Sequence, residues 1–406
     1  MIRATVTPLT NPIRAYAWGS RTAIATLQRR PVPSAQPEAE LWMGAHPAAP
    51  SLLAGEAGPM PLTEVIARDP EAALGRPVVE RFGPRLPYLM KVLAAARPLS
   101  LQAHPDAEQA RAGYAAEAGL APDDPVRNYR DPFHKPELLV AVEPFEALCG
   151  FRAPRESAER LAALGVPDLA PVVDALGSGS PAQGLRRAVE LLMAWPAGRR
   201  ADLVASVAGA GREPTDAAGR GPADSARLAA RLGDLFPQDI GVVVALLLNH
   251  VRLRPGQAVF MPAGTPHAYL CGFGVEAMAA SDNVLRGGFT EKHVDVAELL
   301  RVLRYEVLAD PVVRPTPLAP GVTGWSVPVE EFALARVVVP AGSVPVAVPG
   351  AGPRILVCLH GRARLRTSGP VHDLAGGESV FVPGREPPVE VGGEAGTVVF
   401  QTSIGA

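Results

Sequence analysis

Four side chains of the kind that bind divalent metals occur in three short segments. Gln102 and His104 are separated by one residue in an apolar, extended stretch, where residues i and i+2 share a face. Glu137 begins another apolar run, and His267 ends the turn Pro-Ala-Gly-Thr-Pro-His. Two imidazoles, a carboxylate and an amide oxygen suit Zn²⁺ or a similar metal, with positions left for water or substrate.

Spacing alone leaves alternatives to this ligand set. A histidine in a strand is more often a hydrogen-bonded core or surface residue than a ligand, and mixed spacing is weaker than a Cys-x-x-Cys pair. His134 competes with Glu137, because a strand places residues three apart on opposite faces. Spacing does not distinguish the remaining histidines, which are His46, His250, His293, His360 and His372.

A carboxylate and a guanidinium follow His267 in the sequence. Glu276 lies in the apolar segment Gly-Val-Glu-Ala-Met. Burial raises the pKa of a carboxylate and a nearby cation lowers it, so Glu276 is suited to proton transfer. Asp282 and Arg286 belong to a polar turn that ends in two glycines. Arg286 could stabilise a developing oxyanion, or Asp282 could form the turn with Arg286 as its surface ion-pair partner.

Lysine is rare in this chain and is confined to three positions. The 39 basic residues include only Lys91, Lys135 and Lys292, and each lies in a segment that also holds potential ligands. Lysine carries a compact charge with a tunable pKa, whereas arginine is permanently charged. The distribution predicts that all three lysines have functional positions.

The elements that must position these residues are mostly strands. Residues 1–104 are predicted to be short strands and turns, with extended segments at 87–92 and 99–104. Pro105 suits the first turn of a helix, and residues 137–151 return to strand character. Strands resume at Ile240, and residues 308–406 are again β. Another helix is predicted over Asp295–Leu303.

A block of helical periodicity interrupts the strands between Arg152 and Phe236. Amphipathic runs cover 156–164, 185–195 and 225–236, and Gly/Pro/Ser-rich joints cover 177–182 and 209–224.

An internal repeat indicates the kind of β structure. Residues 256–267 match residues 377–388 at a constant offset: a turn glycine, an apolar strand, then a proline-rich corner. Pro388 occupies the position of His267, so the second copy lacks a ligand. The pattern predicts a mainly β protein of two cupin-type double-sheet jelly rolls with an α-helical insertion. The expected domains are a catalytic one over 1–151 and 240–307, a helical one over 152–239, and a C-terminal one over 308–406 without metal ligands.

Composition restricts the class of protein. With 406 residues, 48% hydrophobic and 20% charged, the chain is typical of a soluble globular protein. A net charge of −2 without a basic tract argues against nucleic acid or an acidic membrane surface as partner. The first residues lack a signal-peptide core, and the longest apolar run, 240–248, is too short to span a bilayer. Three separated cysteines predict buried free thiols and a cytoplasmic location, and we expect a monomer.

These segments together resemble type I phosphomannose isomerase, a zinc enzyme family built from cupin-like domains and a helical domain. The ordered matches run from residue 11 to residue 305. They include the stretches 16–20, 40–47, 86–93, 99–106, 131–138, 145–152, 254–269 and 278–286.

The resemblance implies roles for individual residues. The zinc ligands of the family correspond to Gln102, His104, Glu137 and His267, with one Zn²⁺ per chain. Its essential arginine corresponds to Arg286 and its active-site carboxylate to Glu276. The further substrate-binding or active-site positions are Trp18, His46, Lys91, Ser100, Lys135, Tyr269, Asp282 and Lys292. Ser100 and Lys292 match the part of the pocket that holds the sugar phosphate.

The expected activity is interconversion of mannose 6-phosphate and fructose 6-phosphate through a cis-enediol(ate). Glu276 is the first candidate for the proton-transfer base and Lys135 the second. Two other hypotheses share the scaffold: an Fe(II) dioxygenase, since two histidines and a carboxylate suit that metal, and a non-catalytic sugar-phosphate sensor. The amide ligand Gln102 favours the isomerase, and so do the lysine and arginine positions that could bind an anion.

Overall fold

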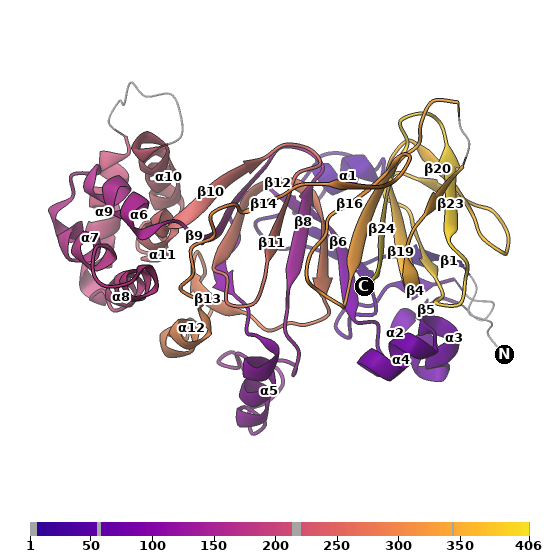
Figure 1. Ribbon diagram of the computed structural model, residues 1–406, viewed down its shortest axis with the longest axis horizontal. Coiled ribbons are helices and arrows are strands. Elements are labelled where there is room, and N and C mark those ends of the chain that lie inside the picture. Colours follow the sequence, from indigo (N-terminus) through magenta and orange to yellow (C-terminus); the bar gives the residue numbers. More distant parts are fainter. Residues whose placement is uncertain (1–5, 55–57, 213–220, 343–344, 406) are drawn as a thin grey trace.

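The computed structural model describes residues 6–54, 58–212, 221–342 and 345–405. Over these residues the chain is rich in antiparallel sheets, with the helices of residues 154–244 gathered at one end and the C-terminal strands at the other (Figure 1). The predicted joint 209–224 and the first five residues lie partly or wholly outside the described ranges.

An eleven-stranded sheet occupies the middle of the molecule (Figure 1). Its main path runs β14-β11-β8-β12-β6-β3-β2, and the other strands pair with one another and with β12. The strands are β2 (Ile13–Arg14), β3 (Glu40–Gly44), β6 (Tyr88–Ala95), β7 (Leu101–Ala103), β8 (Glu137–Ala141), β9 (Phe145–Phe151), β10 (Leu248–Leu253), β11 (Ala258–Met261), β12 (His267–Ala279), β13 (Leu285–Gly288) and β14 (Val312–Val313).

Two further sheets form the C-terminal end, and N-terminal strands join one of them. In the nine-stranded sheet β1 pairs with β22, so residues near the start of the chain complete the C-terminal sheet. Its members are β1 (Thr7–Thr10), β4 (Leu52–Leu53), β5 (Met60–Pro61), β15 (Thr316–Ala319), β16 (Val322–Gly324), β17 (Ala333–Val338), β19 (Ala351–His360), β22 (Ser379–Val382) and β24 (Val398–Ile404). The four-stranded sheet holds β18 (Val346–Val348), β20 (Arg362–Arg366), β21 (His372–Ala375) and β23 (Val389–Gly393).

One apolar core joins the central and C-terminal sheets. It includes Val92 and Val275 of the central sheet together with Ile355 and Phe400 of the C-terminal one. The buried Tyr88 hydroxyl donates to the Pro353 carbonyl at 2.9 Å, which ties the two sheets together within that core. A separate core of apolar side chains fills the space between the C-terminal sheets.

The helical block is present where periodicity placed it, with its own apolar core. It contains two helices that the sequence analysis did not resolve, α7 and α9. The helices of this block are α6 (Pro154–Ala162), α7 (Ala170–Leu176), α8 (Pro181–Met193), α9 (Arg200–Ala210) and α10 (Pro222–Leu235), with 3₁₀ turns at Pro167–Leu169 and Ala197–Arg199. The remaining predicted helix, α12 (Val296–Val302), begins after the N-cap Asp295 as expected.

The prediction of only strands and turns over 1–104 is wrong. Four short helices occur there: α1 (Ala23–Leu27), α2 (Leu62–Arg68), α3 (Pro70–Leu74) and α4 (Arg76–Phe82). Their signals were present, since Asp69 caps α3 and prolines occupy the first turns of α3 and α4. Elements this short show too few turns for a periodicity to appear. Pro105 likewise precedes α5 (Ala107–Ala116), whose N-cap is Asp106.

The expectation that strands resume at Ile240 is also wrong. The run from Ile240 to Leu247 is a short helix, α11 (Gly241–Val244), followed by a 3₁₀ turn over Ala245–Leu247, and β10 begins only at Leu248. Every side chain in this run is buried, so its apolar pattern has neither the helical nor the strand period. Asp239 starts the turn by accepting from the Gly241 N–H at 2.8 Å.

The internal repeat is confirmed at the level of backbone. The strands β11 and β22 lie at the predicted offset, and the glycines before them, Gly256 and Gly377, have φ of 87° and 80°. These left-handed turns favour glycine. The two copies therefore share a turn and a strand, although one ends at His267 and the other at Pro388.

Among the described residues no helix combines the length and the apolarity needed to cross a bilayer. All three cysteines are free; Cys149 and Cys358 are buried as predicted, whereas Cys271 is only half-buried.

Candidate active site

A cavity of about 420 Å³ opens in the central sheet, and residues from many segments line it. The predicted residues that line it are Trp18, His46, Lys91, Ser100, Gln102, Lys135, Glu137, Tyr269, Glu276, Asp282, Arg286 and Lys292. The other two predicted residues, His104 and His267, are buried beside Glu137. The structure thus brings together all fourteen positions.

Strand β12 supplies both ends of the site because it bends between two parts of the sheet. Its first residues pair with β7 and β9, and the residues from Gly272 onwards pair with β6 and, from Gly274, with β8. The bend coincides with a register shift and with Gly272, whose φ is 138° and where a Cβ would lie 2.5 Å from the Phe145 ring. Because of the bend, the Tyr269 hydroxyl donates to Glu276 Oε1 at 2.8 Å.

His104, Glu137 and His267 form a compact buried group. Their ligand atoms all lie within 4.8 Å of one another, and no other group of this kind occurs in the described part of the chain. Nε2 of His104 lies 3.2 Å from Glu137 Oε1, and Nε2 of His267 lies 3.3 Å from Glu137 Oε2. The amide of Gln102 lies 3.4 Å from Nε2 of His267.

Hydrogen bonds on the far side of each ring fix how the two imidazoles face this group. Nδ1 of His104 lies 2.7 Å from the Asn283 carbonyl, and Nδ1 of His267 lies 3.0 Å from the Thr265 carbonyl. A carbonyl only accepts, so each Nδ1 donates, which leaves Nε2 of each ring on the side that faces Glu137. Burial lowers the pKa of His104 to about 4, which keeps this ring neutral near pH 7.

This arrangement leaves buried polar atoms without partners. Nε2 of His104 and Oε2 of Glu137 make no hydrogen bond. Burial favours the protonated form of Glu137, but nearby positive charge, that of Lys135 included, outweighs it and holds the pKa of the carboxyl well below its usual range. Lone pairs of imidazole and carboxylate therefore face one another at close range. Facing lone pairs repel one another, and a cation bound between them would relieve this repulsion.

A second buried group surrounds Glu276. Lys91 Nζ lies 3.0 Å from Glu276 Oε2 and 3.6 Å from Glu40 Oε1. Burial raises the pKa of Glu276, and the charge of Lys91 offsets only part of this effect. For Lys91 itself burial acts to lower the pKa, but the carboxylates of Glu276, Glu40 and Glu137 outweigh it and raise the value.

Asp282 and Arg286 do not form the surface ion pair that was the alternative reading of their turn. Asp282 Oδ2 instead lies 3.0 Å from Nε2 of His46. Arg286 lies directly opposite Gln102 in the pairing of β13 with β7, so the two Cβ atoms are on the same side. No carboxylate pairs with Arg286 among the described residues.

His134, the rival of Glu137, lies outside the group. Its Nε2 is 2.6 Å from Glu331 Oε1, in a contact with the C-terminal part of the chain.

Three residues at the site were not singled out from the sequence. Glu40 is the one charged residue of the fully buried strand β3, and an isolated carboxylate in an apolar strand was an available signal. Asn283 is fully buried and holds the segment before Lys135 through its side chain. Arg130 lines the cavity from that segment, and nothing in its local sequence distinguishes it from Arg127.

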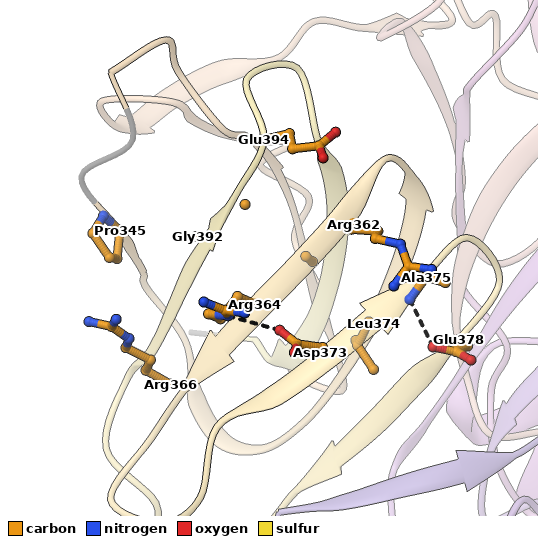
Figure 2. A pocket seen from close by; sticks show the side chains of 12 residues that line it. Pro345, Arg362, Arg364, Arg366, Asp373, Leu374, Ala375, Glu378, Gly392 and Glu394 are labelled. Carbon is orange, nitrogen blue, oxygen red and sulfur yellow. Dashed lines mark hydrogen bonds and ion pairs between the residues drawn. The ribbon is translucent and has the colours of Figure 1, made fainter.

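Another cavity, of about 530 Å³, lies on the C-terminal sheet of four strands (Figure 2). Its charges are balanced, with Arg362, Arg364 and Arg366 facing three carboxylates, one of which, Asp373, accepts from Arg364 at 2.9 Å. None of the described residues that line it is a histidine or a cysteine. Among the described residues its carboxylates do not form a group close enough to hold a metal ion.

Comparison with known proteins connects the geometry to a family. Residues 6–154 match the family model described as phosphomannose isomerase type I, catalytic domain. The chain is 37% identical over 401 residues to the mannose-6-phosphate isomerase of Escherichia coli strain K12, with 95% of this chain and 96% of that protein covered. Mannose-6-phosphate isomerase 1 of Arabidopsis thaliana is 33% identical, with 91% of this chain and 88% of that protein covered.

Solved structures give the same relationship in three dimensions. A mutant of phosphomannose isomerase from Salmonella typhimurium has a TM-score of 0.87 at 33% identity, and the match covers 99% of this chain and 100% of that one. A zinc-bound mannose 6-phosphate isomerase has a TM-score of 0.86 at 34% identity with the same coverage. By sequence along nearly its whole length and by fold, the chain belongs to the type I mannose-6-phosphate isomerase family.

Proposed function

We propose that the protein is a zinc-dependent isomerase that interconverts mannose 6-phosphate and fructose 6-phosphate. The observation that carries this proposal is the pairing of two buried groups in one cavity. One is a set of imidazole and carboxylate lone pairs suited to hold a cation, and the other is a carboxylate that can exchange a proton. Membership of the family supplies the substrate class.

The residues fit Zn²⁺. His104 and His267 would bind through Nε2, Glu137 through its carboxylate and Gln102 through its amide oxygen, which a rotation of the amide brings to the position now held by its nitrogen. When bound there, zinc supplies Lewis-acid polarisation of the sugar oxygens. The carbonyls of Asn283 and Thr265 hold both rings in the tautomer that this requires.

Glu276 is the proposed base, and Lys135 is the second candidate. A carboxylate at this position removes the proton from C2 of the open-chain aldose and returns it to C1, while the proton on O2 moves to O1. The intermediate is a cis-enediol(ate). Tyr269 and Lys91 hold the two oxygens of Glu276 at 2.8 Å and 3.0 Å, which fixes the carboxylate in the cavity wall. Lys135 Nζ lies 3.3 Å from Glu137 Oε1, nearer the ligand group.

The other cavity residues bind and orient the sugar phosphate. Arg286, opposite Gln102, is proposed to stabilise negative charge on the enediolate or to assist ring opening. Ser100 and Lys292 are proposed to hold the phosphate and so to set the positions of C1 and C2. His46, Asp282 and Trp18 complete the wall that faces the substrate.

The three-part organisation remains our proposal for the domains. The catalytic cupin-like domain spans 1–151 and 240–307, the helical domain 152–239 and the ligand-free cupin-like domain 308–406. The N-terminal strands β1, β4 and β5 pair into the C-terminal sheet, so they cross this division. We also propose a cytoplasmic monomer that binds neither nucleic acid nor membrane.

The direct test measures conversion of mannose 6-phosphate to fructose 6-phosphate by the purified protein, before chelation, after chelation and after zinc is returned. We expect activity that disappears with the metal, returns with zinc and needs no O₂. A dioxygenase would require O₂ and Fe(II). Absence of turnover in folded, zinc-loaded protein would contradict the proposal and leave a sugar-phosphate sensor.

A further inference from the structure

Positive charge is distributed unevenly in the active-site cavity. Two of the lysines that line it have a carboxylate partner: Lys91 contacts Glu276, and Lys135 contacts Glu137. Three further cations line the cavity and lie near one another, namely Arg130, Arg286 and Lys292. None of these three has an ion-pair partner among the described residues. An uncompensated cluster of cations in a cavity is suited to bind an anion.

Arg130 is held at this place by its backbone. The Arg130 N–H donates to Oδ1 of the buried Asn283 at 2.7 Å, and the Nδ2 of Asn283 donates to the carbonyls of Asp131 and Phe133 at 2.7 Å and 2.8 Å. The carbonyl of Asn283 also accepts from the ring of His104. One buried residue, Asn283, therefore links the metal-ligand group, through its carbonyl, to the segment that carries Arg130, through its side chain.

The guanidinium of Arg130 retains free donors. Its Nη1 donates to the Pro122 carbonyl and its Nη2 to the Asp124 carbonyl, so at most two of five N–H groups are in use. The cations also influence one another: partial burial lowers the pKa of Lys292, and the charges of Arg286 and Arg130 lower it further. A bound dianion would relieve this mutual repulsion.

We propose that Arg130 is a specificity-determining residue that binds the phosphate group of the substrate together with Lys292. The inference rests on the proposed isomerase function and adds to it a residue on a different segment. Arg130 recognises the phosphate and does not touch C1 or C2. Its loss is expected to weaken binding of the phosphorylated sugar and to leave the chemical step largely intact.

The test compares Arg130→Met, Arg130→Lys and the control Arg127→Met. Arg127 is a suitable control because it also donates to loop carbonyls, those of Tyr129 and Leu120, but does not line the cavity. For Arg130→Met we expect KM for mannose 6-phosphate to rise about tenfold with kcat within about twofold of wild type. Arg130→Lys, which keeps the charge, should recover part of the loss, and the control should match wild type.

Binding measured separately from turnover distinguishes the failure of this inference from the failure of the proposed function. Calorimetry with mannose 6-phosphate gives Kd for each variant whether or not the sugar is converted. Wild type that binds the sugar phosphate without converting it would contradict the isomerase, while the Kd ratio still tests Arg130. Arg130→Met with an unchanged Kd, or with a lower kcat alone, would overturn the inference. Equal losses of affinity in Arg130→Met and Arg127→Met would also overturn the inference, because they would indicate that both arginines only anchor the loop. A wild-type protein that does not bind mannose 6-phosphate would overturn it as well.

Discussion

The two copies of the repeat use the same backbone for different purposes. In each, a left-handed glycine leads into a strand and a proline-rich corner, yet the first copy continues into the long strand β12 and the second into β23, which ends at Gly393. The first surrounds buried imidazoles and carboxylates. The second surrounds a core of apolar side chains, and its cavity lies outside, among paired surface charges (Figure 2). A shared scaffold therefore carries no chemistry until polar residues are placed in its interior.

The largest effect is expected where the copies differ by one ligand. His267→Ala should remove the metal and reduce turnover to background, a greater loss than the roughly 10- to 100-fold typical of an outer-shell partner. The reciprocal change, Pro388→His, should confer no metal binding, because the described residues contain no group of potential ligands there like that of His104, Glu137 and His267. Metal content per chain and kcat/KM are the measurements. A second equivalent of zinc in Pro388→His would contradict this account of the difference.

Within the first copy, Glu276→Gln distinguishes the role of the proton-transfer carboxylate from that of the metal ligands. Turnover should fall by about 10²- to 10⁴-fold, the range for loss of a general base, while zinc content stays at the wild-type level. Glu378→Gln, on the C-terminal cavity, is the matched control and should leave kcat unchanged. Retention of most activity by Glu276→Gln would transfer the role of base to Lys135.

In the second copy the expected effect is on stability alone. Leu356 is fully buried in the apolar core between the C-terminal sheets. Leu356→Ala should lower the free energy of unfolding by about 2–5 kcal/mol through lost packing and a cavity. Denaturant titration measures the loss, and kcat of the folded fraction should equal that of wild type. A change in kcat would show that the C-terminal core influences the site.

The smallest effect is expected at the outer surface of the second copy. Arg364 and Asp373 form an exposed pair on neighbouring strands. Exposed pairs contribute little to stability, so Arg364→Ala should change neither the unfolding temperature nor kcat/KM measurably. A clear change in kcat/KM would assign a function to the cavity in Figure 2, and a clear change in unfolding temperature would show that the pair contributes to stability.

Much of the site could be predicted because its signals are local in the sequence. Lysine at three positions, Gln102 and His104 in alternation, and the corner ending at His267 all depend on residue type and short spacing. The choice of Glu137 over His134 could not be made this way, since it depends on which side chain meets Glu331 from the C-terminal part. Asn283 acts through contacts with a distant segment, which local patterns do not reveal, whereas Glu40 offered the signal of a single carboxylate in an apolar strand.

The fold was predictable to the extent that burial is one-sided. Amphipathic helices such as α8 and α10 could be predicted from the helical spacing of their apolar residues. The wholly buried run after Ile240 has no such spacing and resembled a strand. The pairing of β1 with β22 joins residues from opposite ends of the chain, and no spacing rule indicates such a partner.

The bend of β12 has a consequence for how this protein can change over generations. One continuous strand carries the imidazole His267 before Gly272 and the carboxylate Glu276 after it. Because side chains alternate along a strand, inserting or deleting a single residue beyond the bend would turn Glu276 away from the cavity. Recombination between related genes should therefore be tolerated in the surface loops but not within this strand, where a crossover could change its length. The imidazole His267 and the carboxylate Glu276 are then inherited together.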